Sequence, residues 1–166
     1  MEKKWWHHLT AYQIYTRSFC DSNGDGIGDF QGIISKLDYL QELGIGAIWI
    51  SPFNDSPNYD NGYDISDYYA ILKDFGTMAD LEEMIQECEK RDIIVMMDLV
   101  LNHCSHEHPW FLGACKDRNG KYHDYYIWEE GTEDQPPEGS AAFFGGNVWE
   151  WVPQVKEYYY HTFSIQ

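Results

Sequence analysis

An alternation of two apolar patterns limits what this chain can fold into more than any other feature of its sequence. Short apolar runs of the kind that form β-strands occur at residues 11–15, 47–50 and 93–97. Between them, apolar side chains recur at helical spacing over residues 30–43 and 81–88. The order β-α-β-α-β predicts a parallel sheet with right-handed crossovers. Doubly wound sheets and (β/α)₈ barrels both begin in this way, so the pattern leaves both architectures open.

Local signals sharpen the predicted elements. Gly44 follows the first helical stretch, at a place where glycine commonly ends a helix. Thr77 and Asp80 have the spacing of a capping box, which predicts that the second helix begins there. The last run, Ile93–Met97, is apolar at every position, as expected of a strand that is buried on both faces.

The alternating pattern breaks after Asp98. Residues 104–166 are aromatic and polar, are interrupted by Gly and Pro, and show no clear helix that would complete the next β-α unit. A closed (β/α)₈ barrel typically needs about 250 residues, so the predicted strands amount to part of a barrel at most. We therefore expect a partial α/β domain over residues 1–103 and the beginning of an inserted subdomain over residues 104–166.

The charge and the aromatic content limit the class of ligand. The formal net charge of −17 argues against nucleic acid and anionic membranes as partners, because it would repel phosphate. A neutral ligand such as a sugar is compatible with this charge. Aromatic residues make up 17% of the chain, and flat rings can cover the apolar faces of pyranoses. Ordinary core packing nevertheless accounts for most of these rings.

The sequence favours a soluble, cytoplasmic protein. Residues 1–8 carry charge with no apolar stretch behind them, which argues against a signal peptide. No apolar run reaches the length of a membrane span. The cysteines show no metal-binding or redox spacing, so we expect free thiols at Cys20, Cys88, Cys104 and Cys115.

The polar loop over residues 21–29 is the first candidate site. Oxygen donors recur as in the first part of a calcium-binding loop, at Asp21, Asn23, Asp25, the carbonyl of Ile27, and Asp29. Gly26 occupies the position of the sharp turn, but Gly32 stands where a bidentate glutamate would complete the pattern. We expect structural Ca²⁺ here, with Mg²⁺ as an alternative. The other interpretation is a polar turn whose aspartates cap the backbone.

Two further candidate sites follow the second and third predicted strands. Residues 60–64 (DNGYD) lie in a long connector, and Asp98, Asn102 and His103 follow the third strand directly. Loops at the carboxyl ends of parallel strands commonly carry function. Each pattern also has a structural interpretation, as an Asn-Gly turn with flanking acids and as a histidine satisfied by its neighbours. The sequence contains no nucleophile elbow, phosphate-binding loop or dinucleotide fingerprint.

A series of specific motifs runs in order along the chain. They are residues 12–19 (YQIYTRSF), 21–29 (DSNGDGIGD), 44–52 (GIGAIWISP), 60–67 (DNGYDISD), 75–78 (FGTM), 98–103 (DLVLNH) and 108–111 (HPWF). In these motifs the chain resembles the α-amylase family, glycoside hydrolase family thirteen. The likeness is closest to the branch of oligo-1,6-glucosidase, dextran glucosidase and trehalose-6-phosphate hydrolase. This resemblance implies the first three strands of a (β/α)₈ (TIM) barrel, followed by the start of a subdomain inserted after strand three.

The resemblance also implies roles in a sugar pocket. Asp60 matches the residue that binds the non-reducing-end glucose, and Tyr63 matches the aromatic platform beneath that ring. His103 matches a histidine that donates to a glucose hydroxyl, and Asp98 matches the aspartate that anchors the same motif. Two aromatic residues of the insertion match residues that line the pocket entrance, Phe144 and Phe163.

The family reaction is retaining hydrolysis, in which one carboxylate attacks the anomeric carbon and a second acts as acid and then base. In the family these residues follow strands four and five, and a third carboxylate follows strand seven. No such strands are predicted here, and the motifs of Asp60, Asp64 and Asp98 match binding positions. We therefore expect the N-terminal part of an α-glucosidase for short α-linked glucosides, inactive by itself. Thr16 and Cys104 depart from the family's usual proline and threonine, without consequence for the chemistry.

Other interpretations stay open. Within the same fold, a trehalose synthase or a trehalose-6-phosphate hydrolase would share these motifs, and the features that separate them follow strand four. Outside the enzymes, the alternative is a stand-alone, non-catalytic protein that binds carbohydrate or calcium. Tight binding of isomaltose by the folded 166-residue chain would favour that binding protein.

Overall fold

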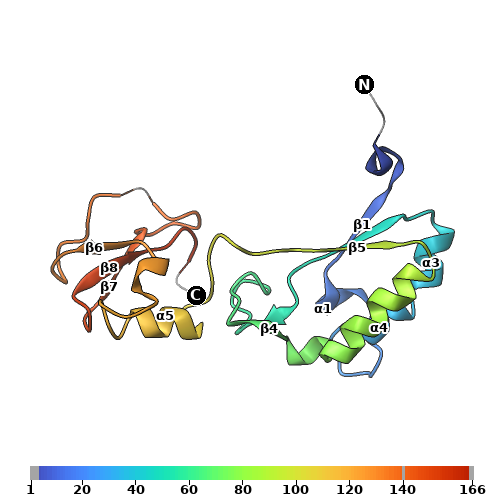
Figure 1. Cartoon of the computed structure of the whole chain (residues 1–166), viewed down its shortest axis with the longest axis horizontal. Coiled ribbons are helices and arrows are strands. Elements are labelled where there is room, and N and C mark those ends of the chain that lie inside the picture. Colours follow the sequence, from blue (N-terminus) through green and yellow to red (C-terminus); the bar gives the residue numbers. More distant parts are fainter. Residues whose placement is uncertain (1–3, 140, 165–166) are drawn as a thin grey trace.

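The computed structural model describes residues 4–139 and 141–164, which form two parts joined by an extended segment (Figure 1). The first part contains a three-stranded parallel sheet of order β1-β2-β5, with the strands β1 (Ala11–Ile14), β2 (Ala47–Ile50) and β5 (Ile94–Met97). Ala47 pairs with Ala11 on one side and with Ile94 on the other, and this register continues along the strands. The predicted parallel sheet is confirmed.

Helices pack against one face of this sheet (Figure 1). They are α2 (Phe30–Ile34), α3 (Leu37–Glu42) and α4 (Met78–Glu89). The core between them is apolar and fully buried, and includes Ile14, Phe30, Ile33, Leu37, Leu40, Ile48, Ile50 and Met84. Burial of a side chain of this size contributes about 1.5–3 kcal/mol to folding.

The helix predicted over residues 30–43 is interrupted at Ser35 and Lys36. The Ser35 hydroxyl donates to the Gly32 carbonyl at 2.7 Å, and the Lys36 amide donates to the Ile33 carbonyl at 2.9 Å. Serine side chains compete with the regular helical hydrogen bonds in this way. The apolar spacing continues across the break, which is why it did not reveal two helices.

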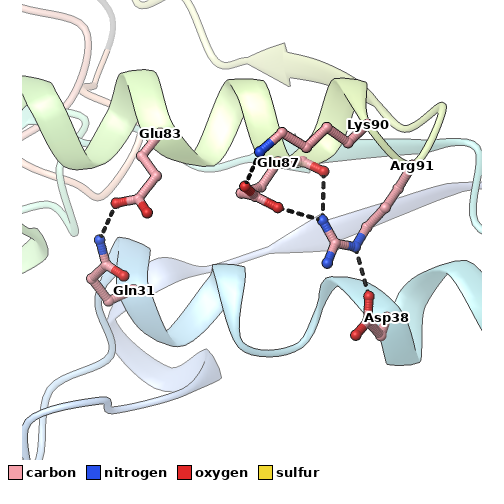
Figure 2. Close-up of polar contacts among 6 residues, drawn as sticks. All are labelled: Gln31, Asp38, Glu83, Glu87, Lys90 and Arg91. Carbon is pink, nitrogen blue, oxygen red and sulfur yellow. Dashed lines mark hydrogen bonds and ion pairs between the residues drawn. The ribbon is translucent and has the colours of Figure 1, made fainter.

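Helix α4 begins where the capping box predicts. The Thr77 hydroxyl accepts from the Asp80 amide at 3.3 Å, and the Asp80 carboxylate accepts from the Thr77 amide at 2.7 Å. Figure 2 shows two polar contacts that connect α4 and the turn after it to the preceding helices, Gln31–Glu83 to α2 and Arg91–Asp38 to α3. It also shows two contacts within α4 and this turn, Arg91–Glu87 and Lys90–Glu87.

The prediction that the third strand is buried on both faces is wrong for β5. Ile94 is 38% exposed, Met96 43% and Met97 50%. Met96 pairs with Trp49 of β2, so these two side chains share the face opposite the buried Ile48 and Ile50. In the described part of the chain β5 is an edge strand whose second face has no helix packed on it.

The connector after β2 contains structure that no sequence pattern predicted. β3 (Asn54–Asp55) pairs antiparallel with β4 (Asp67–Ile71), and the 3₁₀ turn η2 (Lys73–Phe75) precedes α4. Two short elements flank β1, η1 (Trp5–His8) and α1 (Thr16–Phe19). Elements of this length are too short to show a period in the sequence.

The second part is built on a three-stranded antiparallel sheet of order β6-β8-β7. Its elements are α5 (Pro109–Ala114), η3 (His123–Tyr125), β6 (Trp128–Glu130), β7 (Trp149–Val152) and β8 (Glu157–Tyr160). The sequence did not predict the short helix α5, where His108 Nδ1 accepts from the Trp110 amide at 3.1 Å and Pro109 occupies the first turn. None of the helices in residues 4–139 and 141–164 combines the length and apolar character that a membrane crossing requires.

Candidate functional site

Tyr63 connects two other predicted site residues. Its hydroxyl donates to the Asp98 carboxylate at 2.8 Å, and its carbonyl oxygen lies 3.0 Å from His103 Nε2. Since a carbonyl oxygen can only accept, Nε2 carries the proton, and Nδ1 accepts from the Asn102 side-chain amide at 3.1 Å. The connector after β2 and the segment after β5 therefore meet beyond the carboxyl ends of the parallel strands.

The surroundings of Tyr63 keep its hydroxyl protonated. Burial, the hydrogen bond to Asp98 and the negative charges of Asp98 and Asp60 raise the pKa of Tyr63 to about 12. At neutral pH the phenol is consequently a donor, and Asp98 has one oxygen held in place by it. This hydrogen bond involves a charged acceptor, a kind that is stronger than a neutral pair.

Asp60 lies beside this set on the turn that precedes Tyr63. Its main-chain N–H donates to Asp64 at 3.1 Å, and the Tyr63 amide donates to its carbonyl at 3.0 Å. No hydrogen bond to the Asp60 carboxylate is seen among residues 4–139 and 141–164. A half-buried carboxylate with unused lone pairs can accept from the hydroxyls of a ligand.

Aromatic rings from the second part reach the same place. The Phe163 ring lies 5.0 Å from the His103 ring and 6.1 Å from the Phe144 ring, measured between centroids. Phe144 is 63% exposed, so its ring can meet a ligand at the rim. The structure thus gathers all of the predicted sugar-site residues, which are Asp60, Tyr63, Asp98, His103, Phe144 and Phe163.

A cavity of about 430 Å³ opens next to His103 and Phe163. Much of its lining is aromatic and was not predicted to be near a site, in particular Tyr68, Trp110, Tyr126 and Tyr159. His103 and Phe163 line the cavity, whereas Asp60, Tyr63 and Asp98 are not among the described residues that line it. The cavity therefore overlaps the predicted site only in part.

Tyr68 is the residue of this lining with the clearest influence on the site. Its hydroxyl lies 2.9 Å from the Val100 carbonyl oxygen and 3.0 Å from that of His103, so it holds the segment that carries the histidine. Burial raises the pKa of Tyr68 to about 12. The one signal for it in the sequence is its position directly after the 60–67 motif.

The acidic loop over residues 21–29 folds around its own backbone. The Asp21 carboxylate accepts from the amides of Gly26 and Gly24, each at 2.7 Å, and these bonds lower the pKa of Asp21. Asp29 accepts from the Ser22 hydroxyl at 2.8 Å and caps α2 through the Gly32 amide at 2.6 Å, so both of its oxygens are engaged.

The loop suits Ca²⁺ in the kind of donor that it offers, since the ion prefers carboxylate and carbonyl oxygens. Its carboxylates are nevertheless spread out. In residues 4–139 and 141–164, no three His, Cys, Asp or Glu side chains lie close enough together to hold a metal ion. The calcium site therefore stays a prediction.

Comparison with known proteins gives the chain its family. A sequence model described as "Alpha amylase, catalytic domain" matches residues 13–166. The chain belongs to this family. The α-amylase-family relatives include oligo-1,6-glucosidase of Bacillus cereus, 56% identical over 164 residues, which are 99% of this chain and 29% of the relative. Glucan 1,6-alpha-glucosidase of Streptococcus pneumoniae is 52% identical over 99% of this chain and 30% of the relative.

Solved structures of the α-amylase family include proteins with a fold like that of the chain. Trehalose-6-phosphate hydrolase of Bacillus licheniformis matches with a TM-score of 0.94 at 47% identity, over 98% of this chain and 30% of the other. Isomaltulose synthase of Klebsiella sp. LX3 matches with a TM-score of 0.96 at 51% identity, over 100% of this chain and 30% of the other. The chain thus spans about 30% of the length of these relatives.

Proposed function

We propose that this chain is the N-terminal part of a retaining α-glucosidase that hydrolyses short α-linked glucosides. The observation that carries the proposal is the hydrogen-bonded set of Tyr63, Asp98 and His103 beside the Asp60 carboxylate. The relatives named oligo-1,6-glucosidase and glucan 1,6-alpha-glucosidase suggest 1,6-linked substrates.

In this proposal β1, β2 and β5 are the first three strands of a (β/α)₈ barrel. Residues 1–103 belong to the barrel, and residues 104–166 begin the inserted subdomain. The parallel strand order and the intervening helices support this assignment. The exposed apolar face with Trp49 and Met96 would then point to the packed barrel interior.

The site residues would hold the non-reducing-end glucose. The Asp60 carboxylate would accept from sugar hydroxyls, and the Tyr63 ring would lie beneath the apolar face of the pyranose. His103 would turn its Nε2–H from the Tyr63 carbonyl to a hydroxyl. Phe144 and Phe163 would line the entrance, and sugar is the expected small-molecule partner.

The nucleophile and the acid/base are proposed to lie outside these residues. Retaining hydrolysis uses two carboxylates about 5–5.5 Å apart. Asp98 is engaged by Tyr63 and Asp64 is buried, so neither offers a free carboxylate to a substrate. We expect no hydrolysis by the chain alone. We place the protein in the cytoplasm, for which the free cysteines are the support.

A chimera tests the proposed function. Residues 1–164 of this chain would replace the matching stretch of the Bacillus cereus oligo-1,6-glucosidase, which is 56% identical over 164 residues. We expect the chimera to hydrolyse isomaltose and the 166-residue chain not to. Asp60→Asn in the chimera should raise the KM roughly tenfold, which corresponds to about 1.4 kcal/mol. A folded chimera without activity would contradict the proposal.

The likeness to trehalose-6-phosphate hydrolase and to isomaltulose synthase favours a second candidate, a phosphosugar hydrolase or a transferring or isomerising relative such as a trehalose synthase. The features that separate these two candidates from an α-glucosidase follow strand four. Calorimetry of the chain with isomaltose instead distinguishes an enzyme fragment from a stand-alone binding protein. Tight binding of isomaltose by the chain alone would favour a non-catalytic carbohydrate-binding protein.

The loop over residues 21–29 is proposed to bind a structural Ca²⁺, or Mg²⁺, through Asp21, Asn23, Asp25, Ile27 and Asp29. The alternation of oxygen donors supports this. A ligand present at a hundred times its Kd stabilises a fold by about 2.7 kcal/mol, so excess chelator should lower the Tm by several degrees. An unchanged Tm in chelator would count against the metal site.

A further inference from the structure

Asp64 is a buried carboxylate at the end of the turn that carries Asp60 and Tyr63. It is 1% exposed. Its oxygens accept from the Ser56 hydroxyl at 2.9 Å, the Tyr59 amide at 2.8 Å and the Asp60 amide at 3.1 Å. All of these donors belong to the same turn, so Asp64 closes the turn on itself.

The backbone of this turn has a conformation that needs support. Asn58 and Asn61 have φ values of 64° and 54°, in the left-handed region that few residues other than glycine adopt. Gly62 has a φ of 93°, and a Cβ there would lie 2.8 Å from the Pro52 carbonyl oxygen. Conformations of this kind persist only where surrounding contacts hold them, and Asp64 supplies such contacts.

The negative charge of Asp64 strengthens the hydrogen bonds that it accepts from the turn. A carboxylate taken out of water loses hydration that protein donors must replace. Hydrogen bonds to an ionised acceptor are roughly twice as strong as neutral ones. A neutral side chain could accept from the same donors with a smaller desolvation cost, but it would hold Tyr59 and Asp60 less tightly.

We propose that Asp64 is a positioning residue for the glucoside site. Its carboxylate sets the main chain at Tyr59 and Asp60 and thereby places the Asp60 carboxylate, an inference that rests on the proposed function of Asp60. Asp64 touches no substrate, because it is buried and both of its oxygens are used. The Tyr59 ring is stacked on His106 at 5.9 Å, so the same turn also contacts the segment that leads to the second part.

Asp64→Asn in the chimera tests this. One carboxylate oxygen becomes an NH₂ group that faces a donor, so the turn loses at least one hydrogen bond. We expect the KM for isomaltose to rise roughly tenfold or more, since a misplacement of about 1 Å can cost a hundredfold, with kcat nearly unchanged. The matched control is Asp67→Asn, at a nearby exposed aspartate that accepts from the Tyr69 amide, and it should leave both constants unchanged.

A merely structural role would lower the Tm and the active fraction, and hence the apparent kcat, without changing KM. That result, or a KM equal to that of Asp67→Asn, would overturn the proposal. If Asp64→Asn does not fold, Ser56→Ala removes one donor and should raise KM in the same direction by a smaller factor. An unchanged KM in Ser56→Ala would then overturn it.

A chimera that is inactive without any substitution would contradict the proposed function instead. The role of Asp64 is then tested in the same folded but inactive chimera by amide hydrogen exchange. Asp64→Asn should speed exchange at Tyr59 and Asp60 roughly tenfold relative to the buried Ile48, a sign of a locally loosened turn. Equal exchange at these amides in the two proteins would overturn the proposal.

Discussion

Tyr63 contacts two other residues of the candidate site, one through its side chain and one through its main chain. Its hydroxyl holds Asp98 and its carbonyl accepts from His103, so two segments that follow different strands depend on one residue. The same burial and negative charges that fix this geometry raise its pKa. The stability that the hydroxyl contributes must therefore change with pH.

We expect the unfolding free energy of the chimera, which contains this site, to fall as the pH rises from 10 to about 12. The pKa of Tyr63 is raised from 10.0 to about 12, so its contribution is complete below pH 10 and is lost as the pH passes about 12. Tyr68, with its pKa also raised to about 12, acts over the same window. Denaturant melts across this range measure the loss.

Tyr63→Phe should make this pH dependence shallower, because it removes one of the titrating hydroxyls. Tyr69→Phe is the control, since the Tyr69 side chain is 85% exposed and lies outside the site. The expectation fails if the slopes for Tyr63→Phe and the unsubstituted chimera coincide.

Among the elements, β8 is held by charge as well as by strand pairing. Glu157 is 4% exposed and lies 2.9 Å from an Arg118 nitrogen and 3.0 Å from His123 Nε2. β8 leads directly to Phe163, whose ring packs on His103. The contacts of Glu157 therefore help to position the segment that carries Phe163 to the candidate site.

Glu157→Gln should lower the unfolding free energy by about 1–3 kcal/mol, because it removes the charge that faces Arg118 from a buried position. Glu130→Gln is the matched control, because Glu130 contacts the same arginine but has a side chain that is 75% exposed. An exposed ion pair contributes about 0–1 kcal/mol, so the control should change little. Urea melts followed by tryptophan fluorescence compare the two, and equal losses would contradict the argument from burial.

Across the whole molecule, apolar side chains remain exposed along the parallel sheet and the segment after it. They are Trp49, Ile94, Met96, Met97, Leu99 and Leu101. Apolar patches of this kind mark interaction surfaces or aggregation sites, and an unpaired edge strand adds free backbone groups. The helices in contrast bury the opposite face completely at Ile48 and Ile50.

We expect the isolated chain to be unstable and to self-associate through this sheet. Ile94→Lys, which places a charge on the edge strand, should shift sedimentation toward the monomer. Ile85→Lys on α4 is the control, with an isoleucine that is 44% exposed compared with 38% for Ile94. A sharp, cooperative melt of a monomer would contradict this expectation.

The sequence by itself determined that the strands pair in parallel, that α4 starts at Thr77, and the family. The strands and helices follow from the local spacing of apolar residues, and the start of α4 follows from a capping box that spans one turn. The family follows from motifs that occur in order along the chain. The residues of the candidate site came from motifs as well, although their roles stay predictions. Short elements such as α5 and β3 were missed, because a few residues show no period.

Tertiary structure alone decided the exposure of β5 and the contact between Tyr63 and Asp98. The apolar run at 93–97 would suit a strand covered on both faces, and only the arrangement of α2, α3 and α4 shows which face is covered. The Tyr63–Asp98 hydrogen bond joins residues 35 positions apart. No local pattern specifies such a contact, because it depends on how separate segments pack and on which donors burial leaves within reach.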